Sequence, residues 1–157
     1  MSKITTFLTY ENGAEQAVEH YCSIFKDSKI GKKTVYGDGM PFPKGTAMTI
    51  EFWLEGTPYI ALNGGPHFKF TDGVSLAIEV ETQAEVDRFT DKLIEGGGEE
   101  GPCGWLKDRW GLSWQVNPKI LVELLTDKDP AKAQKAAEAM MKMKRIDIAA
   151  LKRAVGL

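Results

Sequence analysis

Aromatic and hydrogen-bonding side chains alternate with aliphatic ones in several short segments of the chain. In the segment 46–54, for example, Glu51 and Trp53 alternate with Ile50 and Phe52. Because successive side chains of a β-strand point to opposite faces, such a segment has one apolar face and one mixed face. Indole rings stack on flat organic molecules, and polar groups orient them by hydrogen bonds. The pattern therefore indicates a binding cleft on the mixed face.

The candidate ligand-binding residues lie on this mixed face or in the loop between the predicted strands, and most carry an aromatic ring or a neutral polar group. They are Trp53, Tyr59, Asn63, His67, Phe68, Ser75, Trp105 and Gln115. His67 and Phe68, with the loop 37–45, are expected at the rim. Since exposed aromatic rings mark interaction surfaces, a cleft or an interface is favoured over a plain solvent-facing sheet.

Glu51 is the one carboxylate that the alternation places near the middle of the mixed face, and two interpretations stay open. It forms an ion pair with a neighbour such as Lys107, or it is the catalytic general base that removes a proton from a bound substrate. Cys103 is interpreted as structural, because no neighbour in the sequence marks it as an activated thiol.

The elements that must position these residues occur twice in the same order. The first set is a strand at 3–10, a helix at 14–25, a weaker strand at 31–36 and a hairpin of strands at 46–54 and 57–62. The second set is a strand at 74–80, a helix at 83–94 and two strands at 104–107 and 112–116. Thr82 and Glu85 have the spacing of a capping box at the start of the second helix.

The last forty residues are predicted to be helical. Asn117-Pro118 and Asp129-Pro130 each place a proline just inside a helix start, behind a capping residue, and Asp147 is expected to cap a last helix. The expected organisation is one domain spanning 1–157, with a first module at 1–64, a second at 74–117 and a helical extension at 118–157.

Composition bounds the function classes. Lys and Arg number 20 against 22 Asp and Glu, a net charge of −2, which argues against a nucleic-acid partner. No apolar run approaches the roughly 20 residues that span a bilayer, so no membrane partner is expected. The chain has two cysteines, which suits a reducing compartment and predicts a cytoplasmic protein.

The segments ALNGGPHFKF and CGWLKDRWGLSWQV and the tail MMKMKRIDIAALKRA resemble one protein family. They are similar to the vicinal oxygen chelate (glyoxalase/bleomycin-resistance/dioxygenase) superfamily, and within it to the PhnB-like, 3-demethylubiquinone-9 3-methyltransferase-like branch. The resemblance implies an α+β fold, in which paired βαβββ modules form a curved mixed sheet that encloses a cleft, followed by C-terminal helices. It also implies a homodimer.

Enzymes of this superfamily hold a divalent metal with four His, Glu or Gln side chains. Matched strand by strand, the resemblance places the four positions near Thr6, Ala61, Ser75 and Gln115. Only Gln115 carries a donor of that set, whereas a transition-metal site needs several imidazole or carboxylate ligands that converge. No metal and no cofactor are therefore expected.

The sequence thus predicts a metal-free protein that binds a small organic molecule. The alternative is an enzyme of the same superfamily, either a metal-dependent isomerase, lyase or oxygenase or a metal-free catalyst that uses Glu51, or an enzyme with the methyltransferase activity that the branch name suggests. A Rossmann-type methyltransferase is disfavoured, because Gly96–Gly98 follows a predicted helix instead of joining a strand to one. A third interpretation makes the mixed face a dimer interface.

Overall fold

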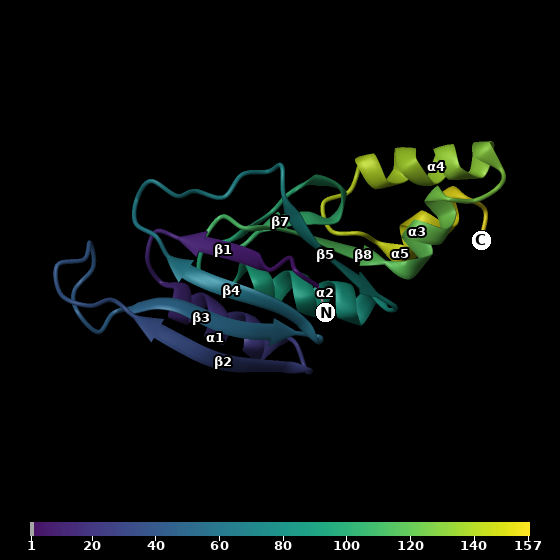
Figure 1. Ribbon diagram of the computed structural model, residues 1–157. Coiled ribbons are helices and arrows are strands. Elements are labelled where there is room, and N and C mark those ends of the chain that lie inside the picture. Colours follow the sequence, from purple (N-terminus) through teal and green to yellow (C-terminus); the bar gives the residue numbers. More distant parts are fainter. Residues whose placement is uncertain (1) are drawn as a thin grey trace. The chain divides into compact units, whose positions relative to one another are not determined.

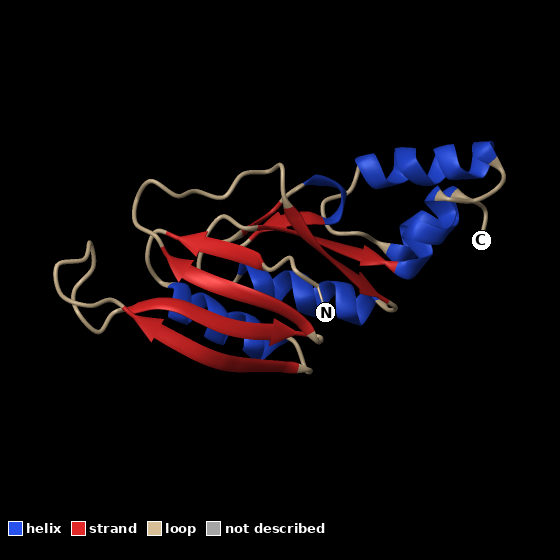
Figure 2. Cartoon of the chain, in the orientation of Figure 1, coloured by secondary structure: helices blue, strands red, loops and turns tan. Residues whose placement is uncertain are grey.

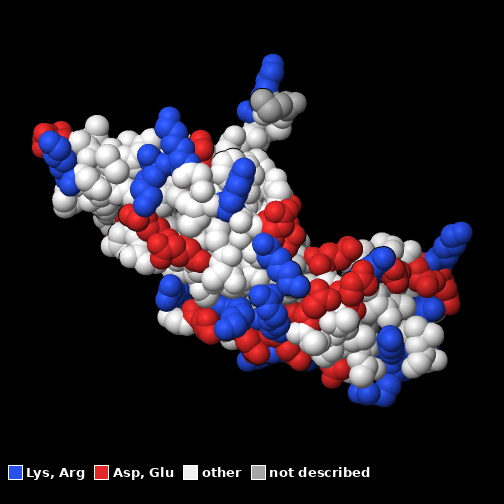
Figure 3. Space-filling view, turned by 90° about the horizontal axis from the view of Figure 1, so that it is seen from below, with Lys and Arg blue, Asp and Glu red and all other residues white. Residues whose placement is uncertain are grey.

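The computed structural model describes residues 2–157, which divide into two compact units, the first ending at Phe70 (unit 1) and the second spanning Thr71–Leu157 (unit 2). Helices and strands of both units are shown in Figures 1 and 2. Within the described residues, no helix is both long and apolar enough to cross a bilayer. On the face drawn in Figure 3, acidic and basic side chains are interspersed.

Unit 1 is a βαβββ module. Its elements are β1 (Thr6–Tyr10), α1 (Ala14–Ile24), β2 (Ser28–Val35), β3 (Ala47–Leu54) and β4 (Thr57–Asn63). The sheet has the order β1-β4-β3-β2, in which β1 and β4 are parallel and the other pairs are antiparallel. Helix α1 lies against one face of this sheet (Figure 1). The predicted turn at Glu55 and Gly56 joins β3 to β4, and both residues have positive φ, as a tight hairpin requires.

The strand register of unit 1 decides which side chains face α1. Phe52 pairs with Tyr59 and Ile50 with Ala61, and directly paired residues share a face. Phe52 and Ile50 are fully buried, in a core to which α1 contributes Tyr21. We call the opposite side the outer face of unit 1; it carries Phe7, Thr9, Lys29, Thr49, Glu51, Trp53, Ile60 and Leu62.

The predicted alternation is correct for β3 and wrong for β4. Tyr59 and Asn63, expected on the mixed face, share the α1 side with Ala61, while Ile60 and Leu62 lie on the outer face. Both alternating sets of β4 contain apolar residues, so hydrophobicity alone did not identify the buried one. Ala61 has no exposed surface, and its small side chain lets α1 lie close to this sheet. The larger side chains of Ile60 and Leu62 point to the outer face.

Unit 2 repeats the module. Its elements are β5 (Ser75–Val80), α2 (Gln83–Ile94), β6 (Glu99–Glu100), a 3₁₀ turn (Pro102–Gly104), β7 (Trp105–Lys107) and β8 (Ser113–Pro118). The sheet order β5-β8-β7-β6, with β5 and β8 parallel, matches that of unit 1 strand for strand. The predicted cap of α2 is present, since the Thr82 side chain accepts a hydrogen bond from the Glu85 amide. The predicted α+β fold of paired βαβββ modules is confirmed.

A buried carboxylate anchors the turn between β7 and β8. Asp108 is 3% exposed and accepts hydrogen bonds from the amides of Trp110 and Leu112 and from the indole N–H of Trp114, each at 3.0 Å. Trp114 faces α2 together with its cross-strand partner Leu106. Asp108 therefore ties the turn to the core of unit 2 and fixes the register of β8.

Three helices complete unit 2: α3 (Lys119–Leu125), α4 (Pro130–Met141) and α5 (Ile148–Ala154). Asp129 and Asp147 cap α4 and α5 with their side chains, as the sequence predicted. The predicted cap at Asn117 is wrong, because β8 continues to Pro118, which is itself the N-cap of α3. The helices have a core of their own, built from Leu121, Leu124, Ala136, Ile146 and Leu151. They follow the end of β8 and lie beyond the sheet of unit 2 (Figure 1).

Asn63 is a structural residue that joins three segments of unit 1. Its Oδ1 accepts from the Ala14 amide at the start of α1, and its Nδ2 donates to the Ala47 carbonyl, both at 2.9 Å. The residue is 4% exposed. Gly13, at the N-cap of α1, has no side chain for that role, so Asn63 satisfies one of the free amides of the first turn from β4.

We expect Asn63→Ala to lower the free energy of unfolding by about 2 kcal/mol, because a buried amide and a buried carbonyl lose their partners. Urea denaturation followed by circular dichroism measures this change. Asn12→Ala, at an exposed position just before α1, is the control and should change stability by less than about 0.5 kcal/mol. Equal effects of the two substitutions would contradict the anchoring role of Asn63.

Candidate functional site

Trp53 is the main aromatic side chain on the outer face of unit 1. The Lys29 ammonium lies 4.4 Å from the centre of its ring, within cation–π range. A hollow of about 450 Å³ adjoins it, bordered by Asp27, Ser28, Lys29, Trp53 and Gly56. Gly31 permits this arrangement, because a Cβ there would lie 2.6 Å from the indole. Trp53 thus lies on the face that the sequence predicted, and the Lys29 ammonium covers part of its ring.

Glu51 shares the outer face with Trp53, and it has a contact that neither interpretation anticipated. Its Oε2 accepts a hydrogen bond from the Lys32 amide at 3.3 Å. Lys107, named above as a possible ion-pair partner, instead pairs with Asp72 at 2.8 Å. The carboxylate of Glu51 is half-buried and has no ion pair within 4.0 Å among the described residues.

His67 and Phe68 lie in the segment after β4, on the surface of unit 1. His67 is exposed, and Phe68 is 50% exposed. The Phe68 ring covers Gly64 so closely that a Cβ there would meet it at 2.8 Å and Thr9 at 2.5 Å. Thr9 belongs to the outer face, so Phe68 lies at the end of that face. The rim position of His67 and Phe68 stays a prediction.

Tyr59 and Asn63 do not join this group. The Tyr59 ring stacks on Phe52, with 5.3 Å between ring centres and 23° between planes. Burial raises the pKa of the Tyr59 hydroxyl above its ordinary value. Both the oxygen and the nitrogen of the Asn63 carboxamide form hydrogen bonds with the backbone, as described above. The ligand contacts that the sequence assigned to these two residues do not fit their places in β4.

Unit 2 contains a cavity of about 390 Å³ beside β6 and β7. Its lining is mainly apolar and includes Trp105; the ten lining residues are Asp72, Glu99, Glu100, Gly101, Pro102, Cys103, Trp105, Leu106, Lys107 and Ser113. We call the segment Glu99–Trp105 the cavity wall. Lys107 and Asp72 form their ion pair at the border, and the hydrogen bond to Asp72 raises the pKa of Lys107. The cavity thus combines an indole, apolar carbons and a few charged groups.

The other predicted residues of unit 2 lie on the same sheet face as Trp105. Gln115 pairs with Trp105 on one side and with Ala77 on the other, next to Ser75 on β5. The Gln115 amide donates to the Ser75 hydroxyl at 2.9 Å, and Asn117 donates to the Gln115 oxygen at 3.3 Å. Ser75, Trp105 and Gln115 are therefore brought together on one face of unit 2, as the alternation predicted.

Most of the cavity wall was missed from the sequence. Glu99 and Glu100 belong to none of the predicted elements, although they form the short edge strand β6 opposite Lys107 and Leu106. Cys103 lines the cavity with a left-handed backbone conformation, φ 61°, which its place before Gly104 did not reveal. The Gly101-Pro102 pair was the available signal, because it indicates a sharp turn beside a predicted strand.

The four positions matched to the superfamily's metal ligands do not form a metal site. Ala61 faces α1, and the outer-face residues of β1 and β4 are Phe7, Thr9, Ile60 and Leu62, none of which ligates transition metals. In residues 2–157 no three His, Cys, Asp or Glu side chains converge as a metal site needs. The donor set of these strands does not fit a divalent metal.

Two βαβββ modules, each with a parallel first and last strand and a single helix on one face, define the fold of the vicinal oxygen chelate superfamily. Within it, the chain belongs to the family described as 3-demethylubiquinone-9 3-methyltransferase, whose model matches residues 2–117. The match ends at Asn117, so the likeness of the tail stays a prediction.

Solved structures agree with this assignment. The PhnB protein of Bacillus cereus is 32% identical, with a TM-score of 0.66, over 74% of this chain and 99% of its own. Protein PA1353 of Pseudomonas aeruginosa is 22% identical, with a TM-score of 0.61, over 75% and 98%. The fosfomycin resistance protein FosX of Mesorhizobium loti shares the fold at 14% identity, with a TM-score of 0.56, over 81% and 100%. None of the curated proteins matches the chain significantly.

Proposed function

We propose that the protein binds a small, flat and mainly apolar organic molecule in the cavity beside Trp105, without a metal. The observation that carries this proposal is the cavity itself. Its volume of about 390 Å³ lies in the range of small-molecule sites, and its lining is apolar with a few polar groups. The Trp105 indole offers a stacking surface, while Lys107, Asp72 and Ser113 offer hydrogen bonds at the border.

Ser75 and Gln115 extend this site along the sheet face of unit 2. Their mutual hydrogen bond keeps both side chains satisfied when no ligand is present, and a ligand can replace it without leaving a polar group unpaired. On unit 1, the predicted ligand contacts of Trp53, His67 and Phe68 concern a separate surface, which does not belong to the lining of this cavity. The predicted homodimer is part of the proposal, with the partly exposed outer-face residue Phe7 as a contact.

An enzyme of the same superfamily is the second candidate. It is favoured by one observation, the half-buried carboxylate of Glu51 on the outer face of unit 1. The family description names a methyltransferase, but neither sheet has the all-parallel order of a Rossmann fold. We therefore consider proton abstraction by Glu51 the form of catalysis that this chain's own residues support best.

The binding site can be tested by NMR with single-ring and double-ring aromatic fragments, including indole and 2-naphthol. The four Trp side chains give separate indole N–H signals, each assigned by substitution. We expect fragments that bind to shift the Trp105 signal most, and Trp105→Ala to weaken binding at least about tenfold through the loss of stacking area. Trp53→Ala is the matched control and should weaken it less. Undiminished binding to Trp105→Ala would place the site elsewhere.

The catalytic role of Glu51 can be tested without knowledge of the reaction. An aromatic fragment that binds and carries a C–H next to a carbonyl group, which a carboxylate can deprotonate, is incubated in D₂O with the protein, and its C–H signals are followed by NMR. A simple binding protein leaves every signal unchanged. The wild type could instead catalyse the exchange of a C–H proton for deuterium, and Glu51→Gln could lose this activity while its affinity for the fragment stays within about twofold of the wild type. That result would contradict the binding proposal and favour the enzyme.

A further inference from the structure

The cavity wall is held from outside the sheet by a segment of the C-terminal extension. The segment Lys142–Asp147 connects α4 to α5, and we call it the strap. The Cys103 amide donates to the Met143 carbonyl at 2.9 Å, and the Gly104 amide donates to the Lys144 carbonyl at 2.6 Å. Two successive amides of the wall thus find their acceptors in the strap.

Ile146 fills the space behind the wall. Its side chain has no exposed surface, and a Cβ on Gly104 would lie 3.0 Å from it. Gly104 also has φ +83°, a conformation that other residues rarely adopt. The strap therefore packs against the wall at Gly104, where the absence of a side chain leaves space for Ile146.

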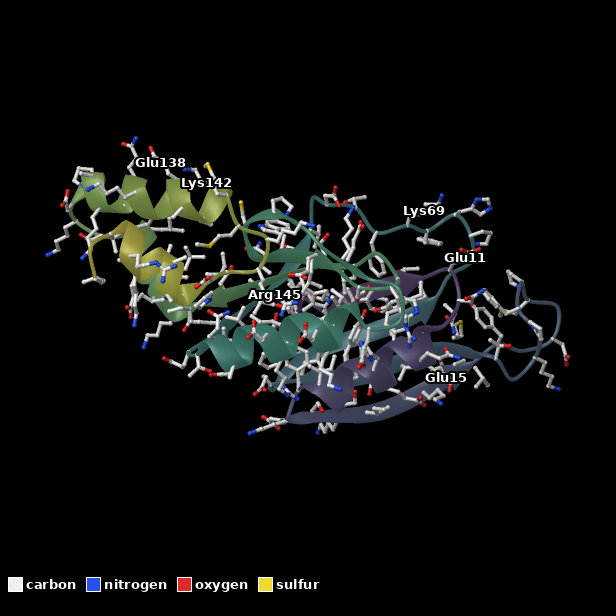
Figure 4. All side chains as sticks on the ribbon, turned by 180° about the vertical axis from the view of Figure 1, so that it is seen from behind. Glu11, Glu15, Lys69, Glu138, Lys142 and Arg145 are labelled. Atoms are coloured by element: carbon white, nitrogen blue, oxygen red, sulfur yellow. The ribbon has the colours of Figure 1, made fainter. Side chains whose placement is uncertain are left out.

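Arg145 adds a charged connection between the wall, the strap and α2. Its guanidinium binds both carboxylate oxygens of Glu100, Nε to Oε1 at 2.9 Å and Nη2 to Oε2 at 3.1 Å. The same group reaches Asp91 at 2.7 Å and Asp87 at 3.4 Å, both on α2. Figure 4 shows Arg145 beside α2. The hydrogen bond from Arg145 holds the pKa of Glu100 below its ordinary value.

Gln83 fixes the strap from the other end of α2. Its Nε2 donates to the Ile146 carbonyl at 3.0 Å, and its Oε1 accepts from the Ile148 amide at 2.8 Å. The strap is thus bonded to α2 at two points, Gln83 and the aspartates that bind Arg145. A segment fixed in this way can hold the wall in one position.

From these contacts we propose that the strap is a positioning element of the ligand cavity, and that Arg145 is the residue that holds Glu100 and the wall in the binding conformation. The family match ends at Asn117, whereas the strap begins at Lys142. The extension therefore contributes to the site that the matched region forms. The use of the cavity by a ligand rests on the proposed function, but the positioning of the wall does not.

Removal of Arg145 leaves three carboxylates, Glu100, Asp87 and Asp91, near one another without their shared cation. Like charges at this range repel, and the bidentate bond that aligns Glu100 is lost. We expect the wall to open on its own while the core of unit 2 stays folded. Cys103 lies on the wall and lines the cavity, so the reactivity of its thiol reports this opening.

The test measures the rate of Cys103 alkylation by iodoacetamide, followed by mass spectrometry, in a Cys22→Ser background that leaves one thiol. Arg145→Met is expected to raise the rate about tenfold or more, since charge-assisted hydrogen bonds of this kind contribute that factor or more. Arg145→Lys should restore part of the protection. Arg153→Met, which removes a cation from an exposed position of α5, is the matched control and should leave the rate unchanged.

Two further measurements separate a positioning role from general destabilisation. Local opening gives an alkylation rate that is insensitive to low urea, whereas a rate that depends on global unfolding rises with urea. Asn63→Ala, which weakens unit 1, should not raise the rate in the absence of urea. If Arg145→Met does not fold, Glu100→Gln takes its place, because it removes the wall's charge and keeps its size.

Equal alkylation rates in Arg145→Met and Arg153→Met, or a rise only through global unfolding, would overturn the proposal. The proposal would be supported by an alkylation rate that rises in Arg145→Met alone, together with aromatic fragments that bind Arg145→Met about tenfold less tightly than they bind the wild type. A selective rise without any fragment binding to the wild type would support the positioning role and refute the proposed ligand site, so that the two failures are distinguishable.

Discussion

Each unit buries one face of a four-stranded sheet under a single helix, and this packing constrains the rest of the structure. Phe52 and Ile50 in unit 1, and Trp114 and Leu106 in unit 2, have the same relation to their helices. The other face of the sheet carries every second side chain of each strand. A polar or aromatic residue can therefore reach a ligand on that face only if it occupies one of these alternate positions. In unit 2 this places Trp105, Ser75 and Gln115 on one face.

Much of the fold could be predicted because the signals were local. The order of elements followed from periodicity, and the caps at Thr82, Asp129 and Asp147 followed from residue type and spacing. The faces of β3 and β8 were predictable because one alternating set was plainly apolar. The faces of β4 were not, because Ile60 and Leu62 look like core residues, whereas Ala61 and Tyr59 are the residues that lie on the α1 side. Which set is buried depends on how closely α1 approaches, and that is a tertiary property.

The candidate site was predictable in part for the same reason. Trp105 could be predicted because an aromatic residue on a strand indicates a contact surface. Its neighbours on the wall could not, since Glu99 and Glu100 carry no strand or binding pattern in the sequence. Arg145 lies 45 residues from Glu100 in sequence. Nothing in the local pattern of the tail indicates that its guanidinium meets a carboxylate of the wall and two of α2, so this contact required the structure.

The cavity of unit 2 is proposed to bind a small organic molecule without a metal. Native mass spectrometry tests this proposal most directly, on protein purified without chelator and mixed with a fragment that shifts the Trp105 signal, before and after treatment with EDTA. We expect one fragment per chain, no retained divalent ion and the same bound fraction in both samples. A divalent ion that survives desalting, with fragment binding that is lost on its removal, would contradict it.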